Sequence, residues 1–187
     1  MVIKNNPDMP EKKHLQSAEY WIKSLKLKPH PEGGYYREIY RSSELVRAEH
    51  LPERFRGART FSTAIYFLLQ PGERSRLHRI KSDEVWHFYR GLPLTIHMFG
   101  ANGSYKVVRL GENPERGERY QYMVPSGTWF GVTVNDGDSS SAEHVQNHFA
   151  LAGCTVAPGF DFEDFETASD KIVTAYPGYQ DVLRKLL

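Results

Sequence analysis

The chain has 187 residues, 40% hydrophobic and 13% aromatic, which is enough to build one domain with a buried core. Its 24 Lys and Arg residues almost balance its 23 Asp and Glu residues, so no strong net charge would attract a nucleic acid or an anionic membrane. The single cysteine, Cys154, excludes an internal disulfide and a Cys-based zinc site, and no N-terminal segment resembles a signal peptide or a membrane span. We therefore expect a soluble, cytoplasmic protein with no nucleic acid or membrane partner.

The N-terminal part predicts a short leader followed by one helix. Residues 1–13 are polar and contain two prolines, which is typical of a flexible leader, and residues 14–187 are expected to form a single domain. Between positions 14 and 27 the apolar residues fall at helical spacing, and the sequence KPHPEGG then ends the pattern. These residues predict an amphipathic helix that packs on the outside of a larger unit.

The rest of the chain predicts a mainly β structure. Short segments rich in aromatic and β-branched residues alternate with turn signals such as QPGE, ANGS and VPSG. No helix-length pattern interrupts them, which favours an antiparallel sandwich or barrel over a parallel sheet. Two short helical patterns, at about 169–176 and 178–187, close the chain. The predicted strands are YYREIYR, TFSTAIYFLL, DEVWHFY, LTIHMFG, YKVVRL, RYQYMV, TWFGVTV and HFALAGCTV.

The stretch around HRIKSDEVWHFYRG contains a spaced pattern of glycine, histidine and glutamate. Gly72 is followed after five residues by His78, then after five by Glu84 and after six by Gly91, and a Pro-x-Gly sequence follows at 125–127. This pattern resembles the two-part signature of the cupin superfamily. Two positions depart from that signature, because Ile80 and Phe130 stand where it has histidines.

Longer segments resemble one subfamily, the fifth cupin family, whose function is unknown. They are HPEGGYYREIYRS, SRLHRIKSDEVWHFYRG, VPSGTWFG and GCTVAPGFDFEDFE, and the resemblance covers roughly residues 15–176. It implies a double-stranded β-helix, or jelly roll, with an N-terminal helix and short C-terminal helices. It also implies a homodimer and a small-molecule pocket inside the barrel. A likeness to sugar-nucleotide epimerases comes with the fold and is an analogy only.

Strand alternation predicts which side chains share the pocket. Residues two apart on a strand project from the same face, so His87 points away from its neighbours Glu84 and Trp86. If the resemblance holds, the shared faces point into the barrel. On successive strands they present Arg76, His78 and Ile80, then Glu84, Trp86 and Phe88, and finally Phe130.

One hypothesis is a metal-dependent cupin, an oxygenase or isomerase. A catalytic metal site normally needs at least three converging protein ligands, and His78 with Glu84 supplies two. Ile80 and Phe130 cannot coordinate a metal, so a third ligand would have to come from another strand. His97 and His148 are the candidates for that ligand.

The favoured hypothesis is a metal-independent enzyme, an isomerase or epimerase of a keto-sugar or nucleotide-sugar. In it His78 is a general base, held in one tautomer by Glu84, while Tyr66 or Tyr36 returns a proton. No cofactor is expected. A third hypothesis is a barrel that binds or stores a ligand without chemistry.

Several other side chains are candidate ligand contacts. Arg37 or Arg76 would steady an enolate or a phosphate. Arg37 and Glu38 lie on opposite faces of one strand, so only one of them faces the pocket, and alternation alone does not say which. The candidate contacts are Tyr36, Arg37, Glu38, Arg76, Trp86, Phe88, His97 and Phe130.

Overall fold

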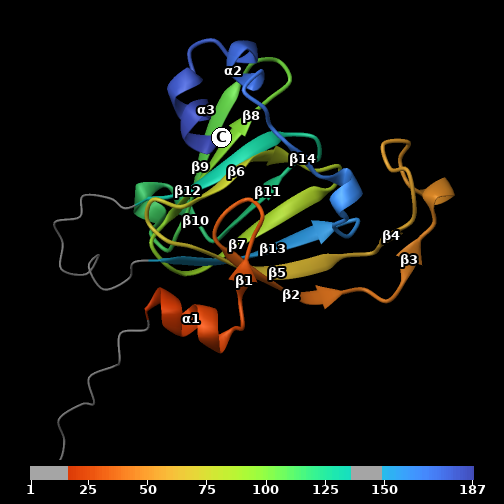
Figure 1. Cartoon of the computed structure of the whole chain (residues 1–187), viewed down its shortest axis with the longest axis horizontal. Helices are drawn as coiled ribbons and strands as arrows, with labels where there is room; N and C mark the ends of the chain where they lie inside the picture. The colour runs from red at the N-terminus through yellow and green to blue at the C-terminus, as the bar shows by residue number, and fades with distance from the viewer. Residues whose placement is uncertain (1–16, 136–148) are drawn as a thin grey trace, which may run out of the picture.

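The computed structural model describes residues 17–135 and 149–187 (Figure 1). The expected leader 1–13, the start of the expected helix and His148 lie outside these residues. Most described strands belong to two six-stranded sheets. The first sheet contains, in spatial order, β1 (Lys28–Pro29), β2 (Tyr35–Arg41), β5 (Thr63–Leu69), β13 (Ala150–Ala157), β7 (Asp83–Gly91) and β11 (Gln121–Val124). The second contains β10 (Glu118–Arg119), β9 (Tyr105–Leu110), β8 (Leu94–Phe99), β12 (Trp129–Val134), β6 (Arg74–Arg79) and β14 (Glu166–Thr167).

The chain winds between the two sheets, which produces the double-stranded β-helix of a jelly roll. Strands β5, β7, β11 and β13 belong to the first sheet, and the intervening β6, β8, β9, β10 and β12 belong to the second. Neighbouring strands are antiparallel except β9 and β10, which pair in parallel. The mainly β fold predicted from the sequence is therefore confirmed, and β2 matches the predicted segment YYREIYR from end to end.

The core lies between the inner faces of the two sheets. It combines side chains of the first sheet, such as Phe67 and Trp86, with side chains of the second, such as Ile96 and Phe130. Each of these four is at most 2% exposed. Burial of such large apolar side chains stabilises the fold by roughly 1.5–3 kcal/mol for each one.

Short helices cover the outer faces of the sheets. Helix α1 (Ala18–Ser24) is capped by Ser17, whose hydroxyl accepts from the amide of Tyr20, and it packs on the first sheet. Helices α2 (Ile172–Ala175) and α3 (Gln180–Leu186) pack on the second sheet at the opposite end of the molecule (Figure 1). No helix within residues 17–135 and 149–187 is long and apolar enough to cross a membrane.

The remaining elements of the described residues are a small third sheet and three 3-10 turns. Strands β3 (Leu45–Val46) and β4 (Arg59–Thr60) pair with each other and project to one side of the two large sheets (Figure 1). The 3-10 turns are η1 (Ala48–His50), η2 (Pro114–Arg116) and η4 (Phe162–Asp164). The turn η4 belongs to a C-terminal segment that returns from β13 toward β6 through β14.

Candidate functional site

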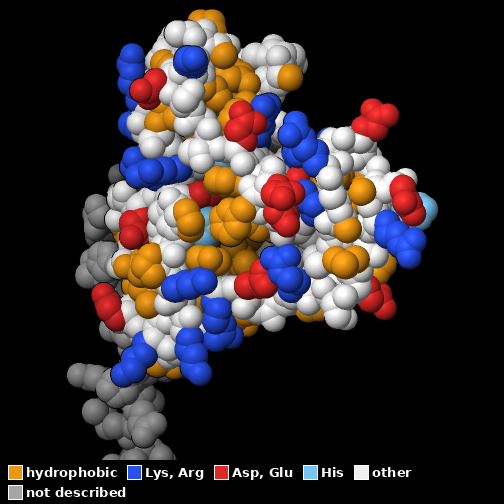
Figure 2. All heavy atoms as spheres, turned by 45° about the vertical axis from the view of Figure 1, so that its right-hand side comes forward, with side chains coloured by type: hydrophobic (Ala, Val, Ile, Leu, Met, Phe, Trp, Pro, Cys, Tyr) orange, Lys and Arg blue, Asp and Glu red, His pale blue; other side chains and the backbone are white. Residues whose placement is uncertain are grey.

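A cavity of about 220 Å³ opens between the two sheets. On the face drawn in Figure 2, hydrophobic side chains gather near the centre with a histidine visible among them, and charged side chains surround them. The polar lining includes His30, Glu32, His78 and Glu84. The apolar lining includes Ile65, Phe67, Ile80, Trp86, Val156 and Phe160.

His78 on β6 is buried, at 3% exposure, and is held in one tautomer. Its Nδ1 lies 2.7 Å from the carbonyl oxygen of Arg76 and 3.3 Å from Oε1 of Glu32. The carbonyl oxygen can only accept, so Nδ1 carries the hydrogen and donates it. Burial lowers the pKa of His78 to about 4, and the ring is therefore neutral at pH 7 with its lone pair on Nε2. The Phe130 ring packs against it, with the ring centroids 4.2 Å apart.

Glu32 is the carboxyl group beside His78, and no sequence pattern predicted its place there. It is 7% exposed, and its Oε2 accepts a hydrogen bond of 2.9 Å from the Ser75 hydroxyl. Burial, and then the nearby charge of Glu84, raise the pKa of Glu32 well above its usual range. The carboxyl group of Glu32, rather than that of Glu84, lies next to Nδ1 of His78.

Two glycines bring Glu32 to this position. Gly33 and Gly34 have φ angles of +106° and +69°, which are readily adopted only by glycine. A Cβ atom on either glycine would collide with a backbone carbonyl oxygen, that of Arg74 for Gly33 and that of Leu68 for Gly34. The close approach lets the amide of Arg76 donate to the Glu32 carbonyl oxygen at 3.0 Å. The adjacent glycines in HPEGG were the sequence signal for this contact.

Glu84 on β7 is the second buried carboxyl group of the cavity, at 7% exposure. Burial raises its pKa to about 7, and a hydrogen bond from the Cys154 thiol opposes this shift. Cys154 is itself buried, and burial followed by the charge of Glu84 raises its thiol pKa well above the usual value. The thiol is therefore protonated, and Glu84 is the group in this pair that titrates near neutral pH.

His30 lies beside Glu32, and no sequence pattern predicted its place in the cavity either. Its Nδ1 accepts a hydrogen bond of 3.2 Å from the amide of Glu32, so a neutral His30 has its hydrogen on Nε2. Burial lowers its pKa to about 4. The ring meets Tyr36 and Phe67 edge-on, at centroid distances of 4.5 and 5.5 Å. His30 and His78 are thus neutral histidines of opposite tautomers in one cavity.

Two β-bulges change the strand alternation expected from the sequence. Ser75 and His78 on β6 are three residues apart, but their partners on β12, Val132 and Phe130, are two residues apart. Because of this extra residue, the side chains of Ser75 and His78 both face the cavity and Arg76 turns outward. Arg76 is exposed and contributes its backbone instead of its side chain. The expectation that Arg76 and His78 share a face is wrong because a bulge adds one residue.

In β2 the bulge falls at Ile39, between Glu38 and Tyr40. Tyr36 and Glu38 line the cavity, and Arg37 between them is not among the lining residues. Beyond the bulge Arg41 also lines the cavity, although simple alternation would turn it away. Arg41 binds Glu38 with two hydrogen bonds of 2.7 and 3.0 Å.

The structure brings only some of the predicted site residues together. His78, Glu84, Trp86, Tyr36 and Glu38 line the cavity, as does Ile80. Phe130 contacts the His78 ring from the core.

The structure places three other candidates away from the cavity lining. Tyr66 alternates with the lining residues of β5 and faces the opposite side, where its ring lies 6.1 Å from that of Tyr89. Phe88 shares the face of Trp86 and packs in the same core cluster, but it is not among the lining residues of the cavity. His97 on β8 bonds the Tyr105 hydroxyl at 2.7 Å and the Thr133 hydroxyl at 3.0 Å.

The residues present do not fit a transition metal. Within residues 17–135 and 149–187 no group of three His, Cys, Asp or Glu side chains is arranged to hold a metal ion. Ile80 and Phe130, which occupy the two histidine positions of the cupin signature, have side chains that cannot coordinate a metal. Ile80 lines the cavity and Phe130 packs on His78. We therefore derive no chemical step through a metal.

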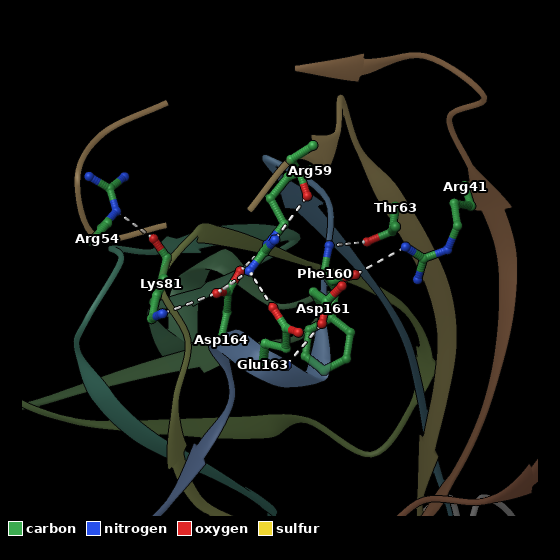
Figure 3. Close-up of polar contacts among 10 residues, drawn as sticks. Arg41, Arg54, Arg59, Thr63, Lys81, Phe160, Asp161, Glu163 and Asp164 are labelled. Carbon is green, nitrogen blue, oxygen red and sulfur yellow. Dashed lines mark hydrogen bonds and ion pairs between the residues drawn. The ribbon is translucent and has the colours of Figure 1, made fainter. Parts of the chain in front are cut away.

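The C-terminal segment closes one side of the cavity with Phe160 and Phe162, and Figure 3 shows how it is fastened. The buried guanidinium of Arg59 on β4 binds both carboxylate oxygens of Asp164, at 2.6 and 2.8 Å. Lys81 adds a contact of 3.3 Å to the same carboxylate. Burial alone would raise the pKa of Asp164, but the hydrogen bonds from Arg59 and Lys81 lower it. This buried carboxylate is therefore charged and fully paired.

A family model described as "Cupin superfamily (DUF985)" matches residues 19–168 of the chain. The chain belongs to this cupin family. The cupin is similar to the uncharacterized yeast protein YML079W from Saccharomyces cerevisiae, with 29% identity over 154 residues, 79% of this chain and 73% of the yeast protein.

Two solved structures resemble this cupin over nearly its whole length. A hypothetical protein from Leishmania major is 37% identical, has a TM-score of 0.79, and is matched over 91% of this cupin and 98% of that protein. Protein SO0799 from Shewanella oneidensis is 40% identical, has a TM-score of 0.77, and is matched over 91% and 97%. These likenesses establish the family and the fold, and they assign no activity.

Proposed function

We propose that this cupin binds a small carbonyl compound in the cavity and catalyses proton transfer on it, as an isomerase or epimerase does. The observation behind the proposal is one enclosed space that holds a neutral histidine and a carboxyl group whose pKa is about 7. A catalytic acid or base works best when its pKa lies near the working pH. Perturbed pairs of this kind are typical of active sites.

The roles follow from the hydrogen bonds of each group. The Nδ1 of His78 is engaged by the Arg76 carbonyl oxygen, so Nε2 is the atom that accepts a proton. Glu32, and not Glu84, lies next to Nδ1 of His78, so the Glu84 carboxyl group can act on the substrate independently of His78. In the proposed reaction one of the two groups, His78 Nε2 or the Glu84 carboxylate, removes the proton next to the carbonyl. A protonated partner then returns a proton to carbon or oxygen, and no net proton is consumed.

The size of the cavity limits the substrate. Pockets for drug-sized ligands enclose roughly 300–1,000 Å³, and this cavity encloses about 220 Å³. A molecule of the size of one sugar ring or smaller would be enclosed, whereas the nucleotide of a nucleotide-sugar would remain outside. A keto-sugar is therefore favoured over a nucleotide-sugar. The homodimer and the cytoplasmic location expected from the sequence stay predictions.

Solvent-deuterium exchange tests the proposal without knowledge of the exact substrate. The protein is incubated in D₂O with small aldoses, ketoses and hydroxyketones, and exchange of the proton next to the carbonyl is followed by proton NMR. We expect catalysed exchange with at least one compound, and a loss of roughly 10²–10⁴-fold in Glu84→Gln. The matched control is Glu118→Gln, which alters a buried glutamate of β10 outside the cavity. Exchange that is absent, or equal in both variants, would contradict the proposal.

A further inference from the structure

Within residues 17–135 and 149–187 the two buried carboxyl groups of the cavity have neutral hydrogen-bond partners only. Glu32 contacts the Ser75 hydroxyl and the rings of His78 and His30, and Glu84 is hydrogen-bonded by the Cys154 thiol. Among the described residues, no Lys or Arg side chain forms an ion pair with either carboxyl group. In the part of the chain that the structure describes, these two acidic groups therefore have no paired cation.

The cations at the edge of the cavity are engaged elsewhere. Arg41 binds the Glu38 carboxylate and donates to the Phe160 carbonyl oxygen at 3.1 Å. The ammonium of Lys28 lies over the Tyr36 ring, 5.1 Å from its centroid. Neither cation forms an ion pair with Glu32 or Glu84, so neither would compensate a negative charge on these groups.

Asp164 is a buried carboxylate outside the cavity lining, and its partners can be compared with those of Glu32 and Glu84. At 5% exposure it is as buried as Glu32 and Glu84, and it is bound by Arg59 and Lys81. Burial of a charge is unfavourable unless a partner compensates it. Among the residues with a described position, the Asp164 carboxylate is bound by two cations, whereas Glu32 and Glu84 are bound by none.

The walls beside these carboxyl groups suit a cation. Phe67 and Trp86 line the cavity, and the faces of aromatic rings attract positive charge. The lone pair on His78 Nε2 adds a further acceptor for an N–H group. An anionic ligand would find no Lys or Arg paired with Glu32 or Glu84 among the described residues, and it would be repelled whenever either carboxyl group is ionised.

We infer that the ligand of this cavity carries a protonated amine, which pairs with Glu32 while Glu84 remains available for proton transfer. The inference rests on the proposed function in that the cavity is the ligand site. It narrows the substrate to a small amino-carbonyl compound, of which an amino sugar is one class. The ammonium would supply the positive charge that Asp164 receives from Arg59.

Matched ligands that differ in one group test this inference. One set is cyclohexylamine, cyclohexanol and cyclohexanecarboxylate, and the second is glucosamine, glucose and glucuronate. Affinities are measured at pH 7 by isothermal titration calorimetry with the full-length protein. We expect at least one amine to bind about tenfold or more tightly than its alcohol or neutral sugar, and the carboxylates to bind most weakly. Equal or tighter binding of the neutral or acidic members, or no binding of either amine, would overturn the inference.

Two variants locate the preference within the cavity. Glu32→Gln is expected to reduce the ratio of amine to neutral affinity by about tenfold, while Glu118→Gln leaves it unchanged. A preference that survives Glu32→Gln would refute the pairing. The two experiments distinguish the two proposals. Amine binding without deuterium exchange would contradict only the proposed catalytic function. Deuterium exchange on neutral compounds without a preference for amines would contradict only the inference that the ligand is an amine.

Discussion

Two histidines of this cupin, on strands of the same sheet, differ in a way that their pKa values do not reveal. Burial lowers the pKa of both His78 and His97 to about 4. His97 bonds Tyr105 and Thr133 with its two ring nitrogens and stacks on the Tyr105 ring. Among the described residues, His78 is hydrogen-bonded through Nδ1 only, and it lines a cavity that also contains Glu84. A lowered histidine pKa therefore indicates burial alone. What distinguishes His78 is its Nε2, which has no hydrogen-bond partner among the described residues, in a cavity that also contains the titrating carboxyl group of Glu84.

The largest expected difference between the two histidines is in proton transfer. His78→Gln removes the Nε2 lone pair, and we expect the deuterium-exchange rate to fall by roughly 10²–10⁴-fold. His97→Gln should leave the rate within about twofold, because His97 does not line the cavity. Rates measured side by side by NMR check this. A comparable loss of exchange rate in both variants would contradict the assignment of His78, and not His97, to the site of proton transfer.

The next effect concerns the segment that closes the cavity of His78. Arg59→Met leaves the buried Asp164 carboxylate without its main partner, and we expect a loss of about 3–5 kcal/mol in the free energy of unfolding. The control is Arg79→Met, which removes an exposed pair with Glu166 and should cost about 1 kcal/mol or less. Urea unfolding of the two variants gives both values. Similar losses would show that burial of the Arg59 pair has little energetic importance.

A smaller effect is the pH dependence that Glu84 contributes to stability. Its pKa is raised from 4.5 to about 7 on folding, so its contribution to stability is fully present below about pH 4.5 and is lost as pH rises to 7. The loss is about 3 kcal/mol. Glu84→Gln should therefore become more favourable, relative to the wild type, between pH 5 and pH 8. Urea unfolding of the variant and the wild type across this range measures the difference, and a constant difference would count against the raised pKa.

The smallest effect is the structural contribution of His97. His97→Leu leaves the hydroxyl groups of Tyr105 and Thr133 without their ring-nitrogen partners, and we expect a loss of about 1–3 kcal/mol. The companion variant Thr133→Val should cost less, because it removes one hydrogen bond and leaves the bond to Tyr105. Thermal unfolding of both variants ranks them. The reverse order would mean that His97 is not the centre of this network.

The sequence predicted the strands well because their apolar alternation and turn residues are local signals. YYREIYR and YKVVRL coincide with β2 and β9. It also indicated that His78 and Glu84 belong together, through a spacing shared with a known family. Both side chains line the cavity.

The details of the lining could not be derived from alternation alone. The bulge at Ile39 turns Arg41 inward, and the bulge in β6 turns Arg76 outward, and both depend on pairing with another strand. His30 and Glu32 precede β2 and belong to no predicted strand, so periodicity gave no orientation for them. The adjacent Gly33 and Gly34 could have indicated a close approach of the backbone, but their contacts are with Arg74 and Leu68, which lie 41 and 34 positions further along the chain.

The central claim is that the cavity holds an acid poised near neutral pH beside a neutral histidine. A ¹³C NMR titration of the glutamate side-chain carboxyl groups, from pH 4 to pH 9, tests it most directly, with Glu84→Gln to assign the resonance. We predict one carboxyl resonance that titrates at about pH 7 and disappears in the variant. If the resonance removed by Glu84→Gln instead titrates near 4.5, the ordinary value for glutamate, the account is contradicted.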